Sequence, residues 1–456
     1  MYSIDYDIFS KTFLDKNGKF SHKQSKQFSM FPYTGSSGDK AVESFDNILG
    51  AFLRMLYSYG SPETIDRNSI IESICEEVEC TDDSITDFKS IVRDLYFLND
   101  TTLRCSGFKM FMYTLSSKND QKISEYLVRT ICDVGQMKKV LDENQTKNNI
   151  LDSLIEAHLP KLEPKKNDVI YIPLIPEIKE RFTKDFIFLI KDKNANYNDV
   201  ISLISYYYFF YTSQVILYIN KFGRSKATIT PVFFCTEWEK TSVSRECFNR
   251  GWKQIDSKLK TMFSHAVLLE MLNQTSNTDL KFTYADLLNI YDDSSCDEKE
   301  QIFSEVLKLK YNYTTLYVEE DGFTFDKDNY EAGNLESLLR GFFNDIIKQF
   351  ESTSRNRAND AYKNSFQSFC KNNVLKRCGR CGNMLVLTEE LLVLLTKVSI
   401  GNRKQIRLNE LFDEFNKRGV FIDRQTQECV VDFYEKLNLI EKKSDSGDAQ
   451  YVKGIL

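Results

Sequence analysis

The stretch VISLISYYYFFYTSQVILYINKF, Val200 to Phe222, decides between two very different folds. It carries no charged residue before Lys221 and is long enough to span a bilayer. Tyrosines lie near its middle, however, and Ser, Thr, Gln and Asn side chains are spread along it, whereas tyrosine in a membrane span usually lies at the interfaces. The pattern therefore predicts a buried central helix in a soluble protein that does not enter a membrane.

The rest of the chain surrounds this helix with further helical patterns. Its 456 residues are enough for two or three domains, and 42% hydrophobic with 28% charged residues is ordinary for a globular protein. Glycine (18) and proline (7) are scarce, and no proline follows Pro231. Few helix breakers and long periodic runs predict a mainly α, multidomain helical protein.

The distribution of helix-breaking residues and of charge along the sequence predicts that the chain is divided into five parts. Residues 1–158 form an N-terminal helical domain, and residues 159–178, which are rich in proline, form a linker or crossing segment. Residues 179–351 form a central helical domain around the Tyr/Phe-rich helix. Residues 352–383 form a basic helix and a Cys-containing turn, and residues 384–456 form a winged-helix domain.

Charge and cysteine usage limit the possible environments. The net charge is −6 and the pI is about 5.5, which excludes a surface that is basic everywhere but not a local basic strip. The 11 cysteines are odd in number and scattered, and MYSIDYDIFSKTF lacks the basic start of a signal peptide. We therefore expect reduced thiols and a cytoplasmic protein.

One local basic strip does occur, in residues 352–380. It holds seven basic residues against Asp360 alone, an excess of +6 in a chain that is acidic overall. Such a contrast is typical of phosphate binding, although a face that docks an acidic protein partner explains it equally well. The basic residues are Arg355, Arg357, Lys363, Lys371, Lys376, Arg377 and Arg380.

The same strip contains a possible structural zinc site. Cys378-Gly-Arg-Cys381-Gly has the spacing of a zinc knuckle, and Cys370 is a candidate third ligand. A fourth thiolate would come from Cys429 or Cys247. The alternative is a buried turn whose thiols bind nothing.

The C-terminal region has the element order of a winged helix. A helix capped by Thr388 and closed at Gly401 precedes a short QIRL strand, and a second helix, capped by Asn409 and closed by Gly419, is expected to follow. A third helix capped by Asp423 precedes two strands around a polar turn. On the third helix we expect four side chains to point inward: Cys429, Val430, Phe433 and Leu437.

In winged-helix proteins the third helix enters the major groove and the hairpin touches the DNA backbone. The candidates for these contacts are Arg424, Gln425, Gln427, Lys442 and Lys443. The third helix is also acidic, as is the hairpin turn, and a DNA-reading winged helix is usually more basic. Docking to a protein therefore stays open beside DNA binding.

The sequence indicates no enzyme. It has no phosphate loop, nucleophile elbow, dinucleotide fingerprint or His-Glu-x-x-His motif. Glu237, Glu239 and Lys240 resemble a nuclease metal site, but no acid lies two residues before the lysine. We expect a non-catalytic protein.

Three blocks give the chain a resemblance to a known family: YYYFFYTSQVILYINKF, EWEKTSVSRECFNRGWK and RGVFIDRQTQECVVDFYEKLNLIEKKSDSGDAQYVKGIL. Together they resemble the DptG family, a subunit of the bacterial DNA phosphorothioation-dependent restriction system, over about residues 180–456. The resemblance implies a subunit that acts with DptF-like and DptH-like ATPase and helicase partners against double-stranded DNA lacking the sulfur mark. It supplies no catalytic residue.

These observations lead to one expected function and one alternative. The first is a non-catalytic subunit of an anti-phage restriction complex that contributes DNA binding. The alternative is a scaffold for the ATPase and helicase subunits that does not itself contact DNA.

Overall fold

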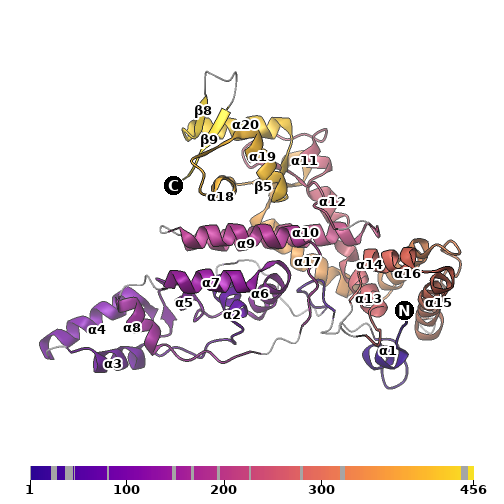
Figure 1. Ribbon diagram of the computed structural model, residues 1–456, viewed down its shortest axis with the longest axis horizontal. Coiled ribbons are helices and arrows are strands. Elements are labelled where there is room, and N and C mark those ends of the chain that lie inside the picture. Colours follow the sequence, from indigo (N-terminus) through magenta and orange to yellow (C-terminus); the bar gives the residue numbers. More distant parts are fainter. Residues whose placement is uncertain are drawn as a thin grey trace.

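The computed structural model describes residues 2–21, 28–35, 45, 47–79, 82–145, 150–165, 169–192, 196–224, 227–277, 281–318, 324–442 and 450–455. The protein is 61% helical with a few small sheets, which confirms the mainly α prediction. Two helices, α9 (Pro176–Lys191) and α10 (Tyr197–Ile219), run across its middle, and the other elements surround them (Figure 1).

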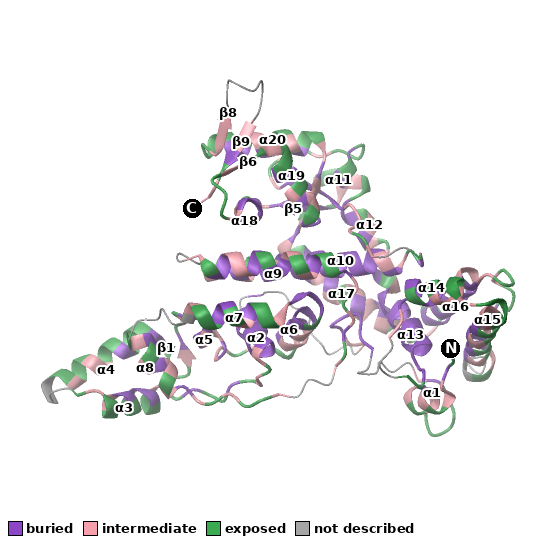
Figure 2. Ribbon diagram, viewed as in Figure 1, coloured by how far each residue is buried: buried purple, intermediate pink, exposed green. Residues whose placement is uncertain are grey.

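Helix α10 is buried on almost every side. It begins at Asn196, whose side chain accepts a hydrogen bond from the backbone N–H of Asn198. Every residue from Tyr206 to Leu217 is buried, so α10 has no solvent-facing stripe there (Figure 2). It is long and apolar enough to cross a membrane, but 83% of its most apolar window lies inside the protein. The prediction of a central core helix is confirmed.

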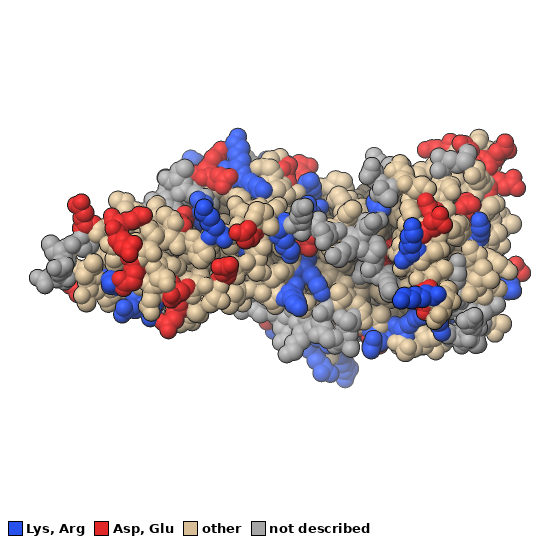
Figure 3. All heavy atoms as spheres, turned by 90° about the horizontal axis from the view of Figure 1, so that it is seen from below, with Lys and Arg blue, Asp and Glu red and all other residues tan. Residues whose placement is uncertain are grey.

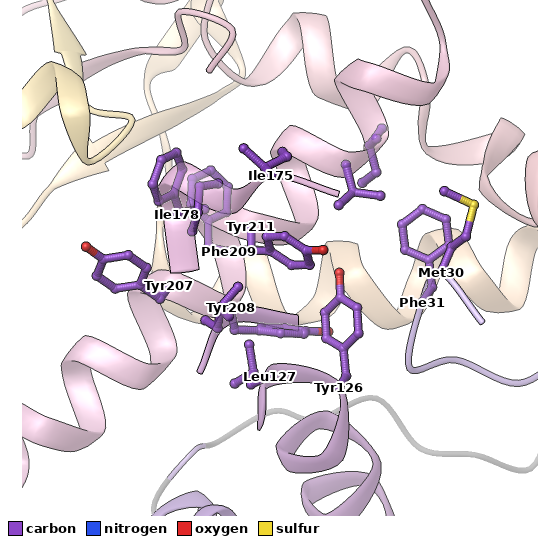
Figure 4. Packing of buried hydrophobic residues seen from close by; sticks show 14 of the residues in the cluster. Met30, Phe31, Tyr126, Leu127, Ile175, Ile178, Tyr207, Tyr208, Phe209 and Tyr211 are labelled. Carbon is purple, nitrogen blue, oxygen red and sulfur yellow. The ribbon is translucent and has the colours of Figure 1, made fainter. Parts of the chain in front are cut away.

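The tyrosines of α10 explain how a polar group can lie in this core. The hydroxyl of Tyr208 is 2.6 Å from that of Tyr33, and Tyr207 donates to the carboxylate of Asp185 at 2.7 Å. Tyr206 donates to the backbone carbonyl of Arg418 at 2.5 Å. The tyrosine rings pack among aliphatic and aromatic neighbours (Figure 4). A buried phenol is tolerated because its ring is apolar and its hydroxyl has a partner.

The elements below α9 come from the first third of the chain (Figure 1). They are α2 (Ile48–Tyr57), α5 (Phe108–Phe111), α6 (Lys118–Ile131) and α7 (Val134–Gln145). One end of the molecule is a smaller unit with its own apolar cluster, which includes Ile70, Ile74, Val92 and Ile155. Its elements are α3 (Arg67–Glu77), α4 (Asp82–Tyr96), β1 (Phe97–Asn99), β2 (Thr102–Leu103) and α8 (Ile150–His158).

The opposite end combines the N-terminus with the centre of the chain. Helix α1 (Tyr6–Phe13) lies there, and the Tyr2 hydroxyl donates to the carbonyl of Leu272 at 2.8 Å. The other elements of this end are α13 (Met262–Leu272), α14 (Tyr284–Asp293), α15 (Cys296–Tyr311), η2 (Asn312–Val318) and α16 (Leu335–Glu351). Helix α17 (Asn356–Asn373) then returns to the middle, where Phe366 and Phe369 pack against Tyr208.

A four-stranded sheet joins the centre of the chain to its C-terminal part. Its strands are β3 (Phe233–Thr236), β4 (Leu375–Arg377), β5 (Asn383–Leu387) and β7 (Phe421–Ile422), in the order β4-β5-β3-β7. Strand β3 is parallel to both β5 and β7, with Cys235 opposite Val386 and Phe233 opposite Phe421. The elements α11 (Glu246–Asn249), α12 (Trp252–Asp256) and η1 (Leu259–Thr261) connect β3 to α13.

The predicted helices and strands of the C-terminal region are present in the expected order, with one further strand, β7, between the second and third helices. They are α18 (Glu389–Ile400), β6 (Gln405–Arg407), α19 (Leu408–Lys417), β7, α20 (Arg424–Lys436), β8 (Ile440–Lys442) and β9 (Gln450–Lys453). Strands β6, β9 and β8 form an antiparallel sheet with β9 in the middle. Thr388 and Asp423 cap α18 and α20 as predicted, and Gly401 and Gly419 have positive φ at helix ends.

Two details of this region were predicted wrongly. Asn409 is not the cap of α19, because the helix already begins at Leu408 and Arg407 takes the cap position without a side-chain hydrogen bond. Leu437 does not point into the core: its side chain is 45% exposed, because α20 ends at Lys436 and the chain turns away. Val430 and Phe433 are buried as predicted, and Cys429 is half-buried.

One apolar core runs through nearly the whole protein. It includes residues from Tyr2 to Val452 and therefore takes side chains from the N-terminal, central and C-terminal parts of the chain. Within the predicted crossing segment, Tyr171 forms a bridge with Ser29, and Pro164 forms one with Tyr59. The five-part division at residues 158, 178, 351 and 383 stays a prediction.

Candidate nucleic-acid interface

Most of the predicted basic strip is divided between the two ends of α17, and Lys363 lies half-buried between them. Arg355 and Arg357 lie at the start of this helix, while Lys371 lies in its last turn. A helix of 18 residues is about 27 Å long, so the two groups are separated by nearly that distance. We call Lys371, Lys376, Arg377 and Arg380 the hairpin group, because three of them lie on β4 or on the turn between β4 and β5.

The group at the start of α17 borders a surface pocket of about 630 Å³. Arg355 donates to the backbone carbonyl of Phe20 at 3.2 Å and so attaches the N-terminal segment to α17. Arg357 is exposed, and the pocket also contains Lys19 and Asp15. Arg355 therefore has a structural contact that the sequence did not indicate.

The hairpin group is exposed at all four positions. The Lys376 ammonium is 3.3 Å from the carboxylate of Glu237, so part of its charge is balanced. Arg377 ends β4, an edge strand of the sheet, and Arg380 lies in the turn that follows. Exposed arginines on a hairpin can reach a phosphate backbone without rearrangement of the core.

The winged-helix candidates are placed less favourably for DNA. Arg424 is 90% exposed, but its guanidinium lies 3.3 Å from the carboxylate of Glu428. Gln425 is exposed and Gln427 is half-buried. Lys442 ends β8, and Lys443 lies outside the described residues, as do Asp445 and Asp448 of the turn.

The first turn of α20 is attached to the centre of the chain by a buried ionic network. The Arg245 guanidinium is 2.5 Å from Asp423 and 3.3 Å from Glu239, and it donates to the Thr426 hydroxyl at 2.7 Å. Burial acts to raise the pKa of Asp423, but the hydrogen bonds from Arg245 and from the Thr426 backbone lower it below its usual value. No pattern in the sequence indicates this network, because Arg245 is one cation among many and is 178 residues from Asp423.

The acids considered for a nuclease site take part in these contacts. Glu239 has a side chain only 2% exposed and faces Arg245 and Thr426. Glu237 pairs with Lys376. Both carboxylates therefore serve as ion-pair partners for cations of this region.

The cysteines do not meet in the predicted set. Cys370 is fully buried in α17 as part of the main core, and burial raises the pKa of its thiol well above its usual value. Cys378 and Cys381 pack against a separate cluster with Cys235 and Cys247. Within the described part of the chain, no three His, Cys, Asp or Glu side chains form a group that could hold a metal ion.

Elsewhere the surface carries both signs of charge. On the face seen from below, basic and acidic side chains alternate, and acidic ones predominate at the end formed by α3 and α4 (Figure 3). That face therefore offers no uniform basic strip for a nucleic acid among the described residues.

In comparisons with known proteins, the chain matches no protein-family model and no curated protein.

Proposed function

We propose that this protein is a non-catalytic, cytoplasmic subunit of a bacterial restriction complex that acts on DNA lacking phosphorothioate modification. The observation that carries the DNA contact is the hairpin group, which has Lys371, Arg377 and Arg380 on the surface at the end of α17 and on the adjoining hairpin. Positive charge concentrated on an exposed hairpin is suited to the phosphates of double-stranded DNA.

We further propose that the region from α18 to β9 is a winged-helix domain. Its support is the order helix, strand, helix, helix, hairpin together with the sheet order β6-β9-β8. Because Glu428 pairs with Arg424 and acidic residues follow along α20, this helix is better suited to a basic protein surface than to a DNA groove. The DptF-like and DptH-like subunits are the proposed partners.

The experiment is DNA binding by the purified full-length protein across a salt series, with Arg377→Ala/Arg380→Ala compared with the wild type. If both arginines bind phosphates, the slope of log affinity against log salt falls by about 0.9 for each arginine that is removed. Arg93→Ala is the matched control, since Arg93 is exposed on α4 at the far end of the molecule. An unchanged slope in the double variant would remove the hairpin from the interface.

A second candidate function, a scaffold without DNA contact, has its own structural support. Ile91 and Leu95 lie one turn apart on α4 with exposures of 50% and 51%, and Leu98 on β1 is 60% exposed. Apolar side chains gathered on a surface are typical of protein docking. Co-purification with the DptF-like and DptH-like subunits distinguishes the two functions. If Leu95→Asp no longer co-purifies with these subunits but still binds DNA, α4 is the docking surface. If Arg377→Glu/Arg380→Glu no longer co-purifies with them but keeps its DNA affinity, the scaffold function is supported.

A further inference from the structure

Four cysteines from three separate segments lie in one small cluster. Cys235 is in β3, Cys247 is in α11, and Cys378 and Cys381 are in the turn between β4 and β5. Cys235 and Cys247 are fully buried, and the two turn cysteines are half-buried against the same cluster. The remaining members are apolar: Phe233, Phe248, Met384, Val386 and Phe421. The fold therefore brings together four thiols that are far apart in the sequence.

The turn that carries Cys378 and Cys381 is tight and closed by backbone hydrogen bonds. The N–H of Cys378 donates to the carbonyl of Gly382 at 2.8 Å, and the N–H of Cys381 donates to the carbonyl of Cys378 at 2.9 Å. Gly379 and Gly382 both have positive φ, +48° and +69°, which allows the chain to reverse within five residues. A Cβ at either glycine would meet no described atom within 4 Å, so conformation rather than space requires glycine there.

Exposed cations lie on the turn itself. Four thiolates around one zinc ion carry a net charge of −2, and Arg377 and Arg380 are exposed next to Cys378 and Cys381 in the chain. Their positive charge can partly balance such a site, in which only deprotonated sulfur coordinates the metal.

We propose that Cys235, Cys247, Cys378 and Cys381 bind one zinc ion as four thiolates. The ion replaces the four thiol protons, which pass to solvent, so binding weakens as the pH falls. The sulfurs would have to move closer than they now lie, since the described residues contain no preformed metal group. The exposed turn is the part that can move, whereas β3 is held between β5 and β7.

This ligand set differs from the one predicted from spacing alone. Cys378 and Cys381 remain, Cys247 becomes a ligand, and Cys235 replaces Cys370, which lies in the main core. Cys429, which lies on α20, faces Glu239 and is not a ligand in this proposal. The site would fasten the β4–β5 hairpin, with Arg377 and Arg380, to β3 and α11. The proposal stands independently of DNA binding.

The test is the zinc content of the full-length protein, purified without chelator and then equilibrated with zinc and desalted. We expect one zinc per chain in the wild type, and none in Cys378→Ser or Cys247→Ser. The matched controls are Cys370→Ala and Cys429→Ser, which keep one zinc. Loss of zinc in Cys370→Ala together with retention in Cys247→Ser would overturn the assignment, as would a wild type that binds no zinc.

A second measurement on the wild type avoids variants that fail to fold. Alkylation of the native protein, mapped by mass spectrometry with and without a chelator, reports on each thiol. We expect Cys378 and Cys381 to be protected until the chelator is added, while exposed Cys296 reacts equally in both samples. Equal reaction of Cys378 and Cys381 with and without chelator would contradict the proposal.

Discussion

The guanidinium of Arg418 lies 2.7 Å from the carboxylate of Asp185, although 233 residues separate them in the chain. Both side chains are almost completely buried, and Tyr207 donates a further hydrogen bond to the same carboxylate. The pair joins the end of α19 to α9 and therefore fastens the C-terminal region to the centre of the protein. Removing one partner of such a buried pair lowers the stability of the folded protein far more than replacing both partners by apolar residues, because a single remaining charge is left buried without a counter-charge.

Removing Arg418 alone should therefore be severely destabilising. We expect Arg418→Met to lower the free energy of unfolding by about 3–5 kcal/mol, because Asp185 is left charged and buried. Urea unfolding followed by circular dichroism measures the change. The double variant Asp185→Leu/Arg418→Met is the control and should recover a large part of the loss. A double variant as unstable as the sum of the two single ones would show that the charges do not interact.

Glu414 makes the same junction sensitive to acid. Burial acts to raise the pKa of this carboxyl, but Lys417, Arg418 and Arg181 outweigh burial and lower it from 4.5 to about 2. Because the folded-state pKa is the lower one, the stabilisation is complete above pH 4.5 and is lost as the pH falls towards 2. We expect the difference in Tm between the wild type and Glu414→Gln to shrink across this interval. A difference that stays constant between pH 5 and pH 2.5 would contradict the assignment.

Gly419 is required for space as well as for conformation. Its φ is +78°, and a Cβ there would come within 2.0 Å of the Phe210 ring on α10. We expect Gly419→Ala to be destabilised by a few kcal/mol through strain and overpacking together. Gly333→Ala is the matched control, since Gly333 has a φ of +75° and a Cβ there meets no described atom within 4 Å. Equal losses in the two variants would mean that Phe210 moves aside without cost.

Arg245 should control the stability of the first turn of α20. Without its guanidinium, Asp423 and the buried Glu239 face each other without the cation between them. We expect Arg245→Ala to speed amide hydrogen exchange of residues 424–427 more than that of α10. Arg250→Ala, which removes an exposed arginine paired with Glu246, should leave this exchange unchanged. A uniform rise over the whole chain would indicate global destabilisation instead.

Local features could be predicted from the sequence, and long-range pairings could not. The burial of α10 could be predicted because its sequence is apolar on every side of the helix. The caps at Thr388 and Asp423 could be predicted from residue type and position. The pairing of β3 with β5 and β7 has no local signal, because the partners lie about 150 and 190 residues further along the chain. For the same reason Cys370 looked like a ligand: it is near the turn in sequence, but α17 directs it into the main core.

The surroundings of α10 determine when it can fold during synthesis. Tyr208 pairs with Tyr33, which is translated earlier, but α10 also has partners in β3, in α17 and at the end of α19, which are translated later. The ribosome therefore releases a 23-residue apolar helix more than 190 residues before its last neighbours appear. During that interval the nascent chain exposes the very segment that most resembles a membrane signal. The apolar surface that these later elements cover is therefore open to aggregation until synthesis is nearly complete.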